Sequence, residues 1–344
     1  MKLSVSVLMA VFNAEKYVRA AIDSILSQSF REFEFIIIDD ASQDQSVQII
    51  STYQDERVRL VRNEENIGLT RSLNKALDIA RGTYIARMDA DDISDPTRLE
   101  KQVSFLDAHP EVGVCGSWTY YLRTANKREL WKYPKQDEVI RIELLLRNQL
   151  AHPSIMLRRS IIEVHQLRYN SNYYTSQDYD LWVRMSDYCQ LANLPEPLIS
   201  YRHHAQSVSA TKQRLQRKNT NQIRLYQLNK LGIYPNWQQW KTHLTLVDQR
   251  PLVSTHELQK RHQWLITLQQ ANRQVNQYPY TDFNNFLTRQ WRFSIQKMSI
   301  YNVRILYLCL ISPFPFLSTL KNSHRLHFLA QCIWGSFRKK TRKL

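Results

Sequence analysis

The chain has 344 residues, of which 43% are hydrophobic and 23% charged, and its formal net charge at pH 7 is +16. This composition excludes a disordered or fibrous chain, and the length favours two folded units. The charge is unevenly distributed, because residues 1–210 hold 25 Lys and Arg against 28 Asp and Glu, whereas residues 211–344 hold 22 against three. We therefore expect a near-neutral domain, residues 1–210, and a basic region, residues 211–344, that meets a negatively charged partner, either nucleic acid or an anionic membrane.

The first part of the chain alternates between strand and helix patterns. Short apolar runs predict buried strands at residues 3–11, 33–38, 58–61, 84–88 and 112–118. Amphipathic spacing predicts intervening helices at residues 15–28, 45–53, 69–80 and 96–108. This alternation predicts an α/β fold, a Rossmann-like and mainly parallel sheet flanked by helices.

Beyond residue 118 the pattern is mixed, with helical spacing at residues 139–147 and 178–187. After residue 210 the chain reads as a mostly helical C-terminal extension. Its longest apolar stretch, residues 305–320, is short for a membrane span and contains two prolines. The four cysteines form no C-x-x-C pair and residues 1–12 lack the pattern of a secretory signal, so we expect a reducing, cytoplasmic compartment.

Two acidic clusters follow predicted buried strands. The first occupies residues 39–44, after the strand at residues 33–38, and the second occupies residues 89–92, after the strand at residues 84–88. Ligands of open α/β sheets bind in the crevice outside such strand ends. Ligands made only of oxygen suit Mg²⁺ or Mn²⁺. The clusters therefore predict a metal-assisted enzyme that acts on a nucleotide-linked substrate.

Five ordered sequence blocks resemble those of family 2 glycosyltransferases. They are residues 5–13 (VSVLMAVFN), 39–44 (DDASQD), 66–74 (NIGLTRSLN), 89–92 (DADD) and 177–184 (QDYDLWVR). The resemblance covers roughly residues 3–210. It implies the GT-A fold and an inverting transfer of a sugar from a nucleotide donor, which we expect to be UDP-linked, to a glycan acceptor.

The resemblance implies donor-binding roles for residues of the first three blocks. Ala10, Val11 and Phe12 would border the base, and Phe12 would either stack on it or simply pack against the protein. Asp40 would accept a hydrogen bond from the uracil N–H, since a carboxylate only accepts. Arg71 would lie near the base or diphosphate, with a surface ion pair as the alternative.

The last two blocks carry the implied metal site and catalytic base. Asp89 and Asp91 match the family's DxD element, so both would contact the donor and the metal. His204 would be a further ligand, with a structural role for it, or His203 in its place, as the alternatives. The cation, Mn²⁺ or Mg²⁺, would stabilise the departing nucleoside diphosphate. Asp178 would take the proton from the acceptor hydroxyl, although a carboxylate near a helix N-terminus is also favoured by the helix dipole alone.

The implied acceptor residues are His152, Gln177 and Trp182, although Trp182 also fits the core. Gln177 departs from the family pattern, which usually has Glu at this position. Two alternatives to a glycosyltransferase stay open: a sugar-1-phosphate nucleotidyltransferase and a non-catalytic nucleotide or glycan-binding module.

The basic region allows three interpretations: attachment to an anionic membrane surface, nucleic-acid binding, or a solvated helical surface. We expect membrane attachment, because a lipid-linked acceptor in bacterial surface polysaccharide synthesis would require it. The chain would then be a peripheral protein at the inner face of the plasma membrane, with no specific nucleic acid as partner.

Overall fold

The computed structural model describes residues 3–124, 127–204, 211–298 and 301–338. The chain forms two compact units, Met1–Ile223 and Arg224–Leu344, and the division falls inside helix α9, Gln213–Lys230. The change in charge at residue 210 precedes this helix.

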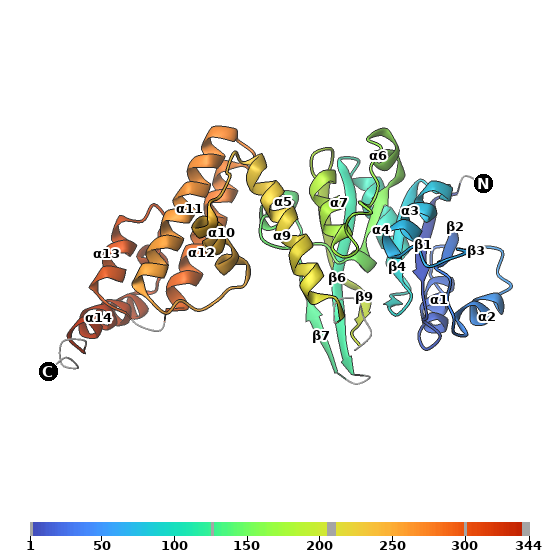
Figure 1. The fold of residues 1–344 in the computed structure, drawn as a ribbon, viewed down its shortest axis with the longest axis horizontal. Coiled ribbons are helices and arrows are strands. Elements are labelled where there is room, and N and C mark those ends of the chain that lie inside the picture. The colour runs from blue at the N-terminus through green and yellow to red at the C-terminus, as the bar shows by residue number, and fades with distance from the viewer. Residues whose placement is uncertain (1–2, 125–126, 205–210, 299–300, 339–344) are drawn as a thin grey trace. The chain divides into compact units, whose positions relative to one another are not determined.

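A nine-stranded mixed sheet forms the centre of the first unit, and the predicted α/β fold is confirmed (Figure 1). The strand order is β3-β2-β1-β4-β8-β6-β9-β5, and β7 pairs with β6 alone. The strands are β1 (Val5–Val11), β2 (Phe33–Asp39), β3 (Val58–Arg62), β4 (Tyr84–Asp89), β5 (Ile93–Ser94), β6 (Val112–Thr124), β7 (Lys127–Trp131), β8 (Met156–Arg158) and β9 (Gln190–Arg202). Strands β1 to β4 pair in parallel, so their carboxyl ends meet at one edge.

Helices cover both faces of this sheet (Figure 1). They are α1 (Val18–Leu26), α2 (Ser46–Ser51), α3 (Leu69–Ile79), α4 (Arg98–Ala108), α5 (Asp137–Glu143), α6 (Arg159–Val164) and α7 (Gln177–Met185), with a 3₁₀ turn, η1, at His152–Ser154. Side chains alternate along a strand, so Val7 and Met9 of β1 belong to the core with α1 and α4, whereas Leu8 belongs to the core with α3 and α7.

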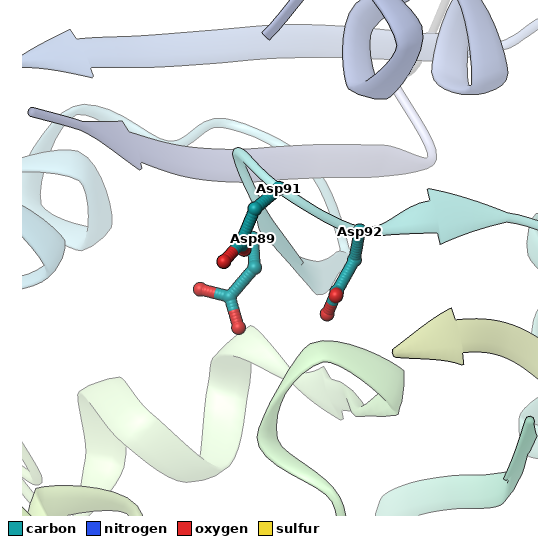
Figure 2. Close-up of side chains that lie close together, drawn as sticks. All are labelled: Asp89, Asp91 and Asp92. Carbon is teal, nitrogen blue, oxygen red and sulfur yellow. The ribbon is translucent and has the colours of Figure 1, made fainter. Parts of the chain in front are cut away.

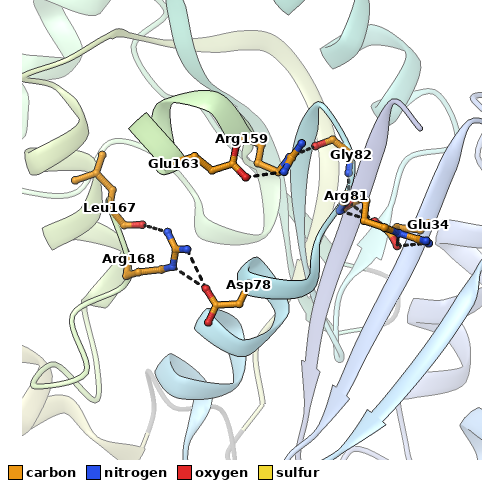
Figure 3. Close-up of polar contacts among 9 residues, drawn as sticks. Glu34, Asp78, Arg81, Gly82, Arg159, Glu163, Leu167 and Arg168 are labelled. Carbon is orange, nitrogen blue, oxygen red and sulfur yellow. Dashed lines mark hydrogen bonds and ion pairs between the residues drawn. The ribbon is translucent and has the colours of Figure 1, made fainter. Parts of the chain in front are cut away.

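The turn between α3 and β4 contains Gly82, where a larger residue would collide with the backbone of β1. A Cβ at Gly82 would lie 2.4 Å from the backbone nitrogen of Ser6. Polar contacts fix the same turn (Figure 3): Arg81 pairs with Glu34 at 3.0 Å, and the Arg159 guanidinium donates to the Gly82 carbonyl at 2.7 Å. The close approach between the turn and β1 helps to hold β4, whose end carries the acidic cluster.

The second unit is helical among its described residues. Its elements are the C-terminal part of α9, then α10 (Trp237–Val247), α11 (Thr255–Val275), α12 (Tyr280–Gln296), α13 (Val303–Ile311), the 3₁₀ turn η2 (Leu317–Thr319) and α14 (Asn322–Arg338). Its core is partly aromatic, with Trp264, Trp291 and Phe286 fully or almost fully buried. Within the part of the chain that the structure describes, each helix is too short or too polar to cross a bilayer.

Strand β9 was not predicted from the sequence. It contains Pro195 and Pro197, which lack a backbone donor and weaken a strand pattern. The strand nevertheless pairs in parallel with β6, and the register shifts at Trp118, which lies opposite Pro197. Long-range pairing with β6 therefore overrides the local sequence signal.

Candidate functional site

The carboxyl ends of β1, β2 and β4 bring three predicted blocks together. In the sheet register Val11 lies beside Asp39, and Ala10 lies beside Asp89. A cavity of about 630 Å³ opens at this edge. Its wall includes the predicted donor residues Ala10, Val11, Phe12, Asp40, Asp89 and Asp91, together with His204. The Phe12 side chain is 49% exposed and therefore has an open surface.

Asp40 is a buried carboxylate that holds the loop after β3. Its Oδ1 accepts hydrogen bonds from the Ile67 backbone N–H at 3.0 Å, the Asn63 amide at 2.8 Å and the Ser72 hydroxyl at 3.0 Å. Its Oδ2 accepts from the Gly68 N–H at 2.8 Å. Four donors thus converge on Asp40, which fixes the wall that Gly68 contributes to the cavity.

Three carboxylates gather at the end of β4 (Figure 2). One ligand atom from each of Asp89, Asp91 and Asp92 lies within 4.8 Å of the others. Arg87 forms an ion pair with Asp89, and His204 Nε2 lies 2.9 Å from Asp91 Oδ2. The structure therefore brings the predicted metal ligands Asp89, Asp91 and His204 close together, and their role as ligands stays a prediction.

Asp92 is the most deeply buried member of this cluster. Its Oδ1 accepts a hydrogen bond from the Arg202 N–H at 2.7 Å, while its buried Oδ2 has no hydrogen-bond partner among the described residues. Burial raises the pKa of Asp92 well above its usual value, and the charges of Asp89 and Asp91 add to that rise. A cluster that disfavours its own ionisation and offers only hard oxygen atoms fits a divalent cation.

A second cavity, of about 500 Å³, shares Asp89 and Asp91 with the first. Asp178 lines it from the N-terminal turn of α7, and Asn148 donates an amide hydrogen to Asp178 Oδ2 at 2.7 Å. Burial raises the pKa of Asp178, while the Tyr179 backbone N–H and the Arg87 charge oppose that rise.

Two of the predicted acceptor residues also line the second cavity. His152 Nε2 lies 2.9 Å from the Tyr169 hydroxyl, and burial lowers the pKa of His152 well below 6.5, so the ring is neutral. Gln177 is only 4% exposed, and its Oε1 finds no hydrogen-bond partner in the described part of the chain.

Two predicted residues lie elsewhere. Trp182 is 0% exposed and belongs to the core, where its ring packs edge-on against His152 at 6.1 Å between centroids. It lies on the inward face of α7, so the assignment of Trp182 to the acceptor wall is corrected to a core position. Arg71 is exposed on α3 and is not among the described residues that line either cavity.

Sequence reasoning missed Arg87 and Asn148. An arginine inside the otherwise apolar run of β4 was the available signal for Arg87, since a buried cation needs an acidic partner. Asn148 follows α5 in a segment without a recognisable pattern, and only the fold brings it to Asp178.

Comparisons with known proteins agree with this architecture. Residues 6–165 match the family described as Glycosyl transferase family 2. The chain is similar to the O-antigen biosynthesis glycosyltransferase WbnJ of Escherichia coli, at 36% identity over 214 residues, which cover 59% of this chain and 81% of that protein. It is also similar to the Escherichia coli UDP-Glc:alpha-D-GlcNAc-diphosphoundecaprenol beta-1,3-glucosyltransferase WfaP, at 29% identity over 209 residues, which cover 60% and 80% of the two chains.

Among solved structures, that of S. aureus TarS 1-349 in complex with UDP aligns with a TM-score of 0.55 and 17% identity, covering 86% of this chain and 88% of that one. This likeness concerns the fold, which is the GT-A type that the resemblance implied. The chain belongs to glycosyl transferase family 2. It is therefore a glycosyltransferase, rather than a nucleotidyltransferase or a non-catalytic binding module.

Proposed function

We propose that this enzyme transfers a sugar, with inversion, from a UDP-linked donor to a hydroxyl group of a glycan acceptor. The observation that carries the proposal is the pair of cavities that share Asp89 and Asp91. The donor would occupy the cavity beside Phe12 and Asp40, and the acceptor would occupy the cavity beside Asp178. The bond to be broken would then lie near the shared carboxylates.

A divalent cation, Mn²⁺ or Mg²⁺, fits the shared carboxylates. Asp89 and Asp91 would hold it, with His204 beside Asp91 and Asp92 beneath them, because the unpartnered oxygen of Asp92 and the crowding of like charges favour a cation there. When bound, such a cation neutralises negative charge on a diphosphate leaving group.

Asp178 would act as the general base. Inversion requires a base that receives the acceptor proton as the hydroxyl oxygen attacks. A raised pKa makes Asp178 a stronger base, and the Asn148 amide holds its carboxylate in place by donating to Oδ2. Arg87 opposes the rise in the pKa of Asp178, which helps to keep the carboxylate ionised.

The donor assignment is supported by the wall of the first cavity and by one relative. Ala10, Val11 and Phe12 would contact the base, and Asp40 would act mainly by holding the Gly68 loop against it. The name of the relative WfaP specifies UDP-Glc as its donor. Arg71 is exposed on α3 and is not among the described residues that line the first cavity, so its contact with the donor stays a prediction.

The acceptor would be a lipid-linked glycan in bacterial surface polysaccharide synthesis. The relatives WbnJ and WfaP carry names that specify O-antigen biosynthesis and a diphosphoundecaprenol-linked acceptor. Such an acceptor would place the chain at the inner face of the plasma membrane as a peripheral protein.

The second unit offers a surface suited to that location. Helices α13 and α14 expose Tyr307, Leu310, Leu326 and Trp334. No acidic residue follows Asp282 in the sequence, while basic residues continue to the end of the chain. Apolar and aromatic side chains among basic residues are typical of a protein that binds an anionic membrane interface.

The metal assignment is tested with Asp91→Asn. We expect this variant to lose sugar transfer by a factor of about 10² to 10³ and to lose the Mn²⁺ dependence of UDP binding in calorimetry. Asp78→Asn is the matched control, since Asp78 is exposed and pairs only with Arg168 among the contacts described (Figure 3). Near-normal turnover by Asp91→Asn would refute the metal site.

The base is tested with Asp178→Asn, which we expect to bind UDP normally and to turn over about 10² to 10⁴ times more slowly. Undiminished turnover would remove Asp178 from the mechanism.

Flotation of the full chain with phosphatidylglycerol vesicles, compared with phosphatidylcholine vesicles, tests the membrane surface; equal flotation with both would contradict an electrostatic attachment.

A further inference from the structure

One wall of the second cavity is aromatic. It is formed by Thr119 and Tyr121 of β6, Trp131 of β7 and Tyr201 of β9, together with Tyr133 and His203. The sheet register explains why these side chains meet. Thr119 lies opposite Trp131, and Tyr121 lies opposite Tyr201. Because side chains alternate along strands, residues at these positions share one face of the sheet.

The rings on this face are stacked. The Tyr121 and Trp131 rings lie 4.6 Å apart between centroids and only 8° from parallel. Tyr201 continues the stack, at 5.8 Å and 21° from Tyr121. Trp131 is still 41% exposed, so much of its ring surface is open to a ligand. A large flat aromatic surface open to a cavity suggests a flat apolar partner.

The same cavity also presents hydrogen-bond acceptors. Ser176, Gln177 and Asp178 line it, and the buried atoms Gln177 Oε1 and Ser176 Oγ have no hydrogen-bond partner among the residues described. Burial raises the pKa of Tyr133, and the nearby charge of Asp178 adds to that rise, so the aromatic wall lies close to this carboxylate. Buried polar atoms without partners favour a ligand that supplies donors.

These two sets of groups define the ligand. A lipid chain would use the aromatic wall but neither the carboxylate nor the amide oxygen, and an anion would be repelled by the acidic residues. The nucleobase of the donor is assigned to the first cavity by the proposed function. A pyranose ring has both features: a face of C–H groups, which carry partial positive charge suited to the negative face of an aromatic ring, and several hydroxyl donors around its edge.

We propose that Trp131, backed by the stacked ring of Tyr121, forms a platform on which the ring of the acceptor sugar stacks, while the sugar's hydroxyl groups donate to Gln177 and Asp178. This inference rests on the proposed function, since it assigns the acceptor to the second cavity. Trp131 would then determine how tightly the acceptor binds. A substitution at Trp131 would leave the donor cavity unchanged, because Trp131 lines the second cavity and not the first.

The test uses the full chain with UDP and MnCl₂, and saturation-transfer NMR with methyl β-glucopyranoside, methyl β-galactopyranoside and methyl N-acetyl-β-glucosaminide as probes. Mannitol, an acyclic polyol, is the control ligand. We expect transfer to the ring C–H protons of at least one glycoside and little transfer to mannitol. Trp131→Ala should weaken that glycoside's binding about five-fold, and Trp131→Phe should restore most of it.

Leu130→Ala is the matched control variant, because Leu130 is exposed on the neighbouring position of β7 and lies opposite Tyr120, on the other face of the hairpin. It should bind the glycosides as the wild type does. Equal binding by Trp131→Ala and wild type, or no transfer to any glycoside, would overturn the platform. UDP binding, measured by calorimetry on the same samples, separates this failure from failure of the proposed function.

Discussion

Replacing Asp40 by Asn tests whether this residue acts by holding the loop of the donor cavity. An asparagine can keep its oxygen at the position of Oδ1, where three donors converge. Its NH₂ group then faces the Gly68 N–H, which in the native chain donates to Oδ2 at 2.8 Å. The variant loses one hydrogen bond to a charged acceptor and leaves buried donors facing one another.

The expected cost follows from that geometry. Losing a hydrogen bond to a charged group, and burying a donor without an acceptor, should lower the free energy of unfolding of the first unit by about 3 kcal/mol. For a unit of this size, such a loss lowers Tm by roughly 6 to 12 °C. The affinity for UDP should fall as well, because the displaced Gly68 lines the donor cavity.

Differential scanning calorimetry of the full chain measures this change. The transition of the first unit is identified as the one that UDP and Mn²⁺ shift upward, since a ligand stabilises the unit that binds it. The control Asp78→Asn should stay within about 0.5 kcal/mol of wild type, because its ion pair with Arg168 is exposed. An unchanged Tm with lost UDP affinity would show that Asp40 contacts the nucleotide directly instead.

Three further changes test other parts of the structure. Gly82→Ala should lower Tm, at a cost of about 3 kcal/mol, because its Cβ would lie 2.4 Å from the Ser6 nitrogen; a wild-type melting curve would contradict the close approach. Burial lowers the pKa of His152 well below 6.5. Below pH 6.5 the His152 side chain therefore binds a proton in the unfolded chain but not in the folded chain. The free energy of unfolding then falls by at most about 1.4 kcal/mol for each pH unit. The difference in the free energy of unfolding between wild type and His152→Gln should therefore shrink as the pH drops from 6.5 towards 5. Urea unfolding at several pH values measures this, and a difference that does not change with pH would refute the reasoning. Asn236→Ala removes the capping box that Asn236 forms with Gln239 at the start of α10, and should destabilise the second unit by about 1 kcal/mol in the same calorimetric assay.

Much of the α/β region could be predicted because local pattern and tertiary structure agree there. The apolar runs of β1, β2 and β4 are buried as predicted, and their parallel pairing places the loop after Val11 beside Asp89. β9 escaped prediction because its two prolines contradict the pairing that the fold imposes. The strand predicted at residues 112–118 is too short, because β6 continues to Thr124 through its pairing with β7 and β9.

Only some residues of the candidate site could be predicted from the sequence. Asp89, Asp91 and Asp178 were predicted as site residues because the blocks that contain them resemble known motifs. The aromatic wall could not be, because Tyr121, Trp131 and Tyr201 are ordinary strand residues until the register brings them together. For Trp182 the sequence allowed both the core and the acceptor wall, and the helical period turns it into the core.

The hairpin that carries Trp131 has a peripheral place in the sheet. β7 pairs only with β6 and lies off the main strand order, while the strands that build the donor cavity lie on the other side of β8. Substitutions on this hairpin would then disturb neither the parallel strands nor the acidic cluster. Under the proposed function, substitutions on this hairpin would alter acceptor preference and leave the donor cavity unchanged.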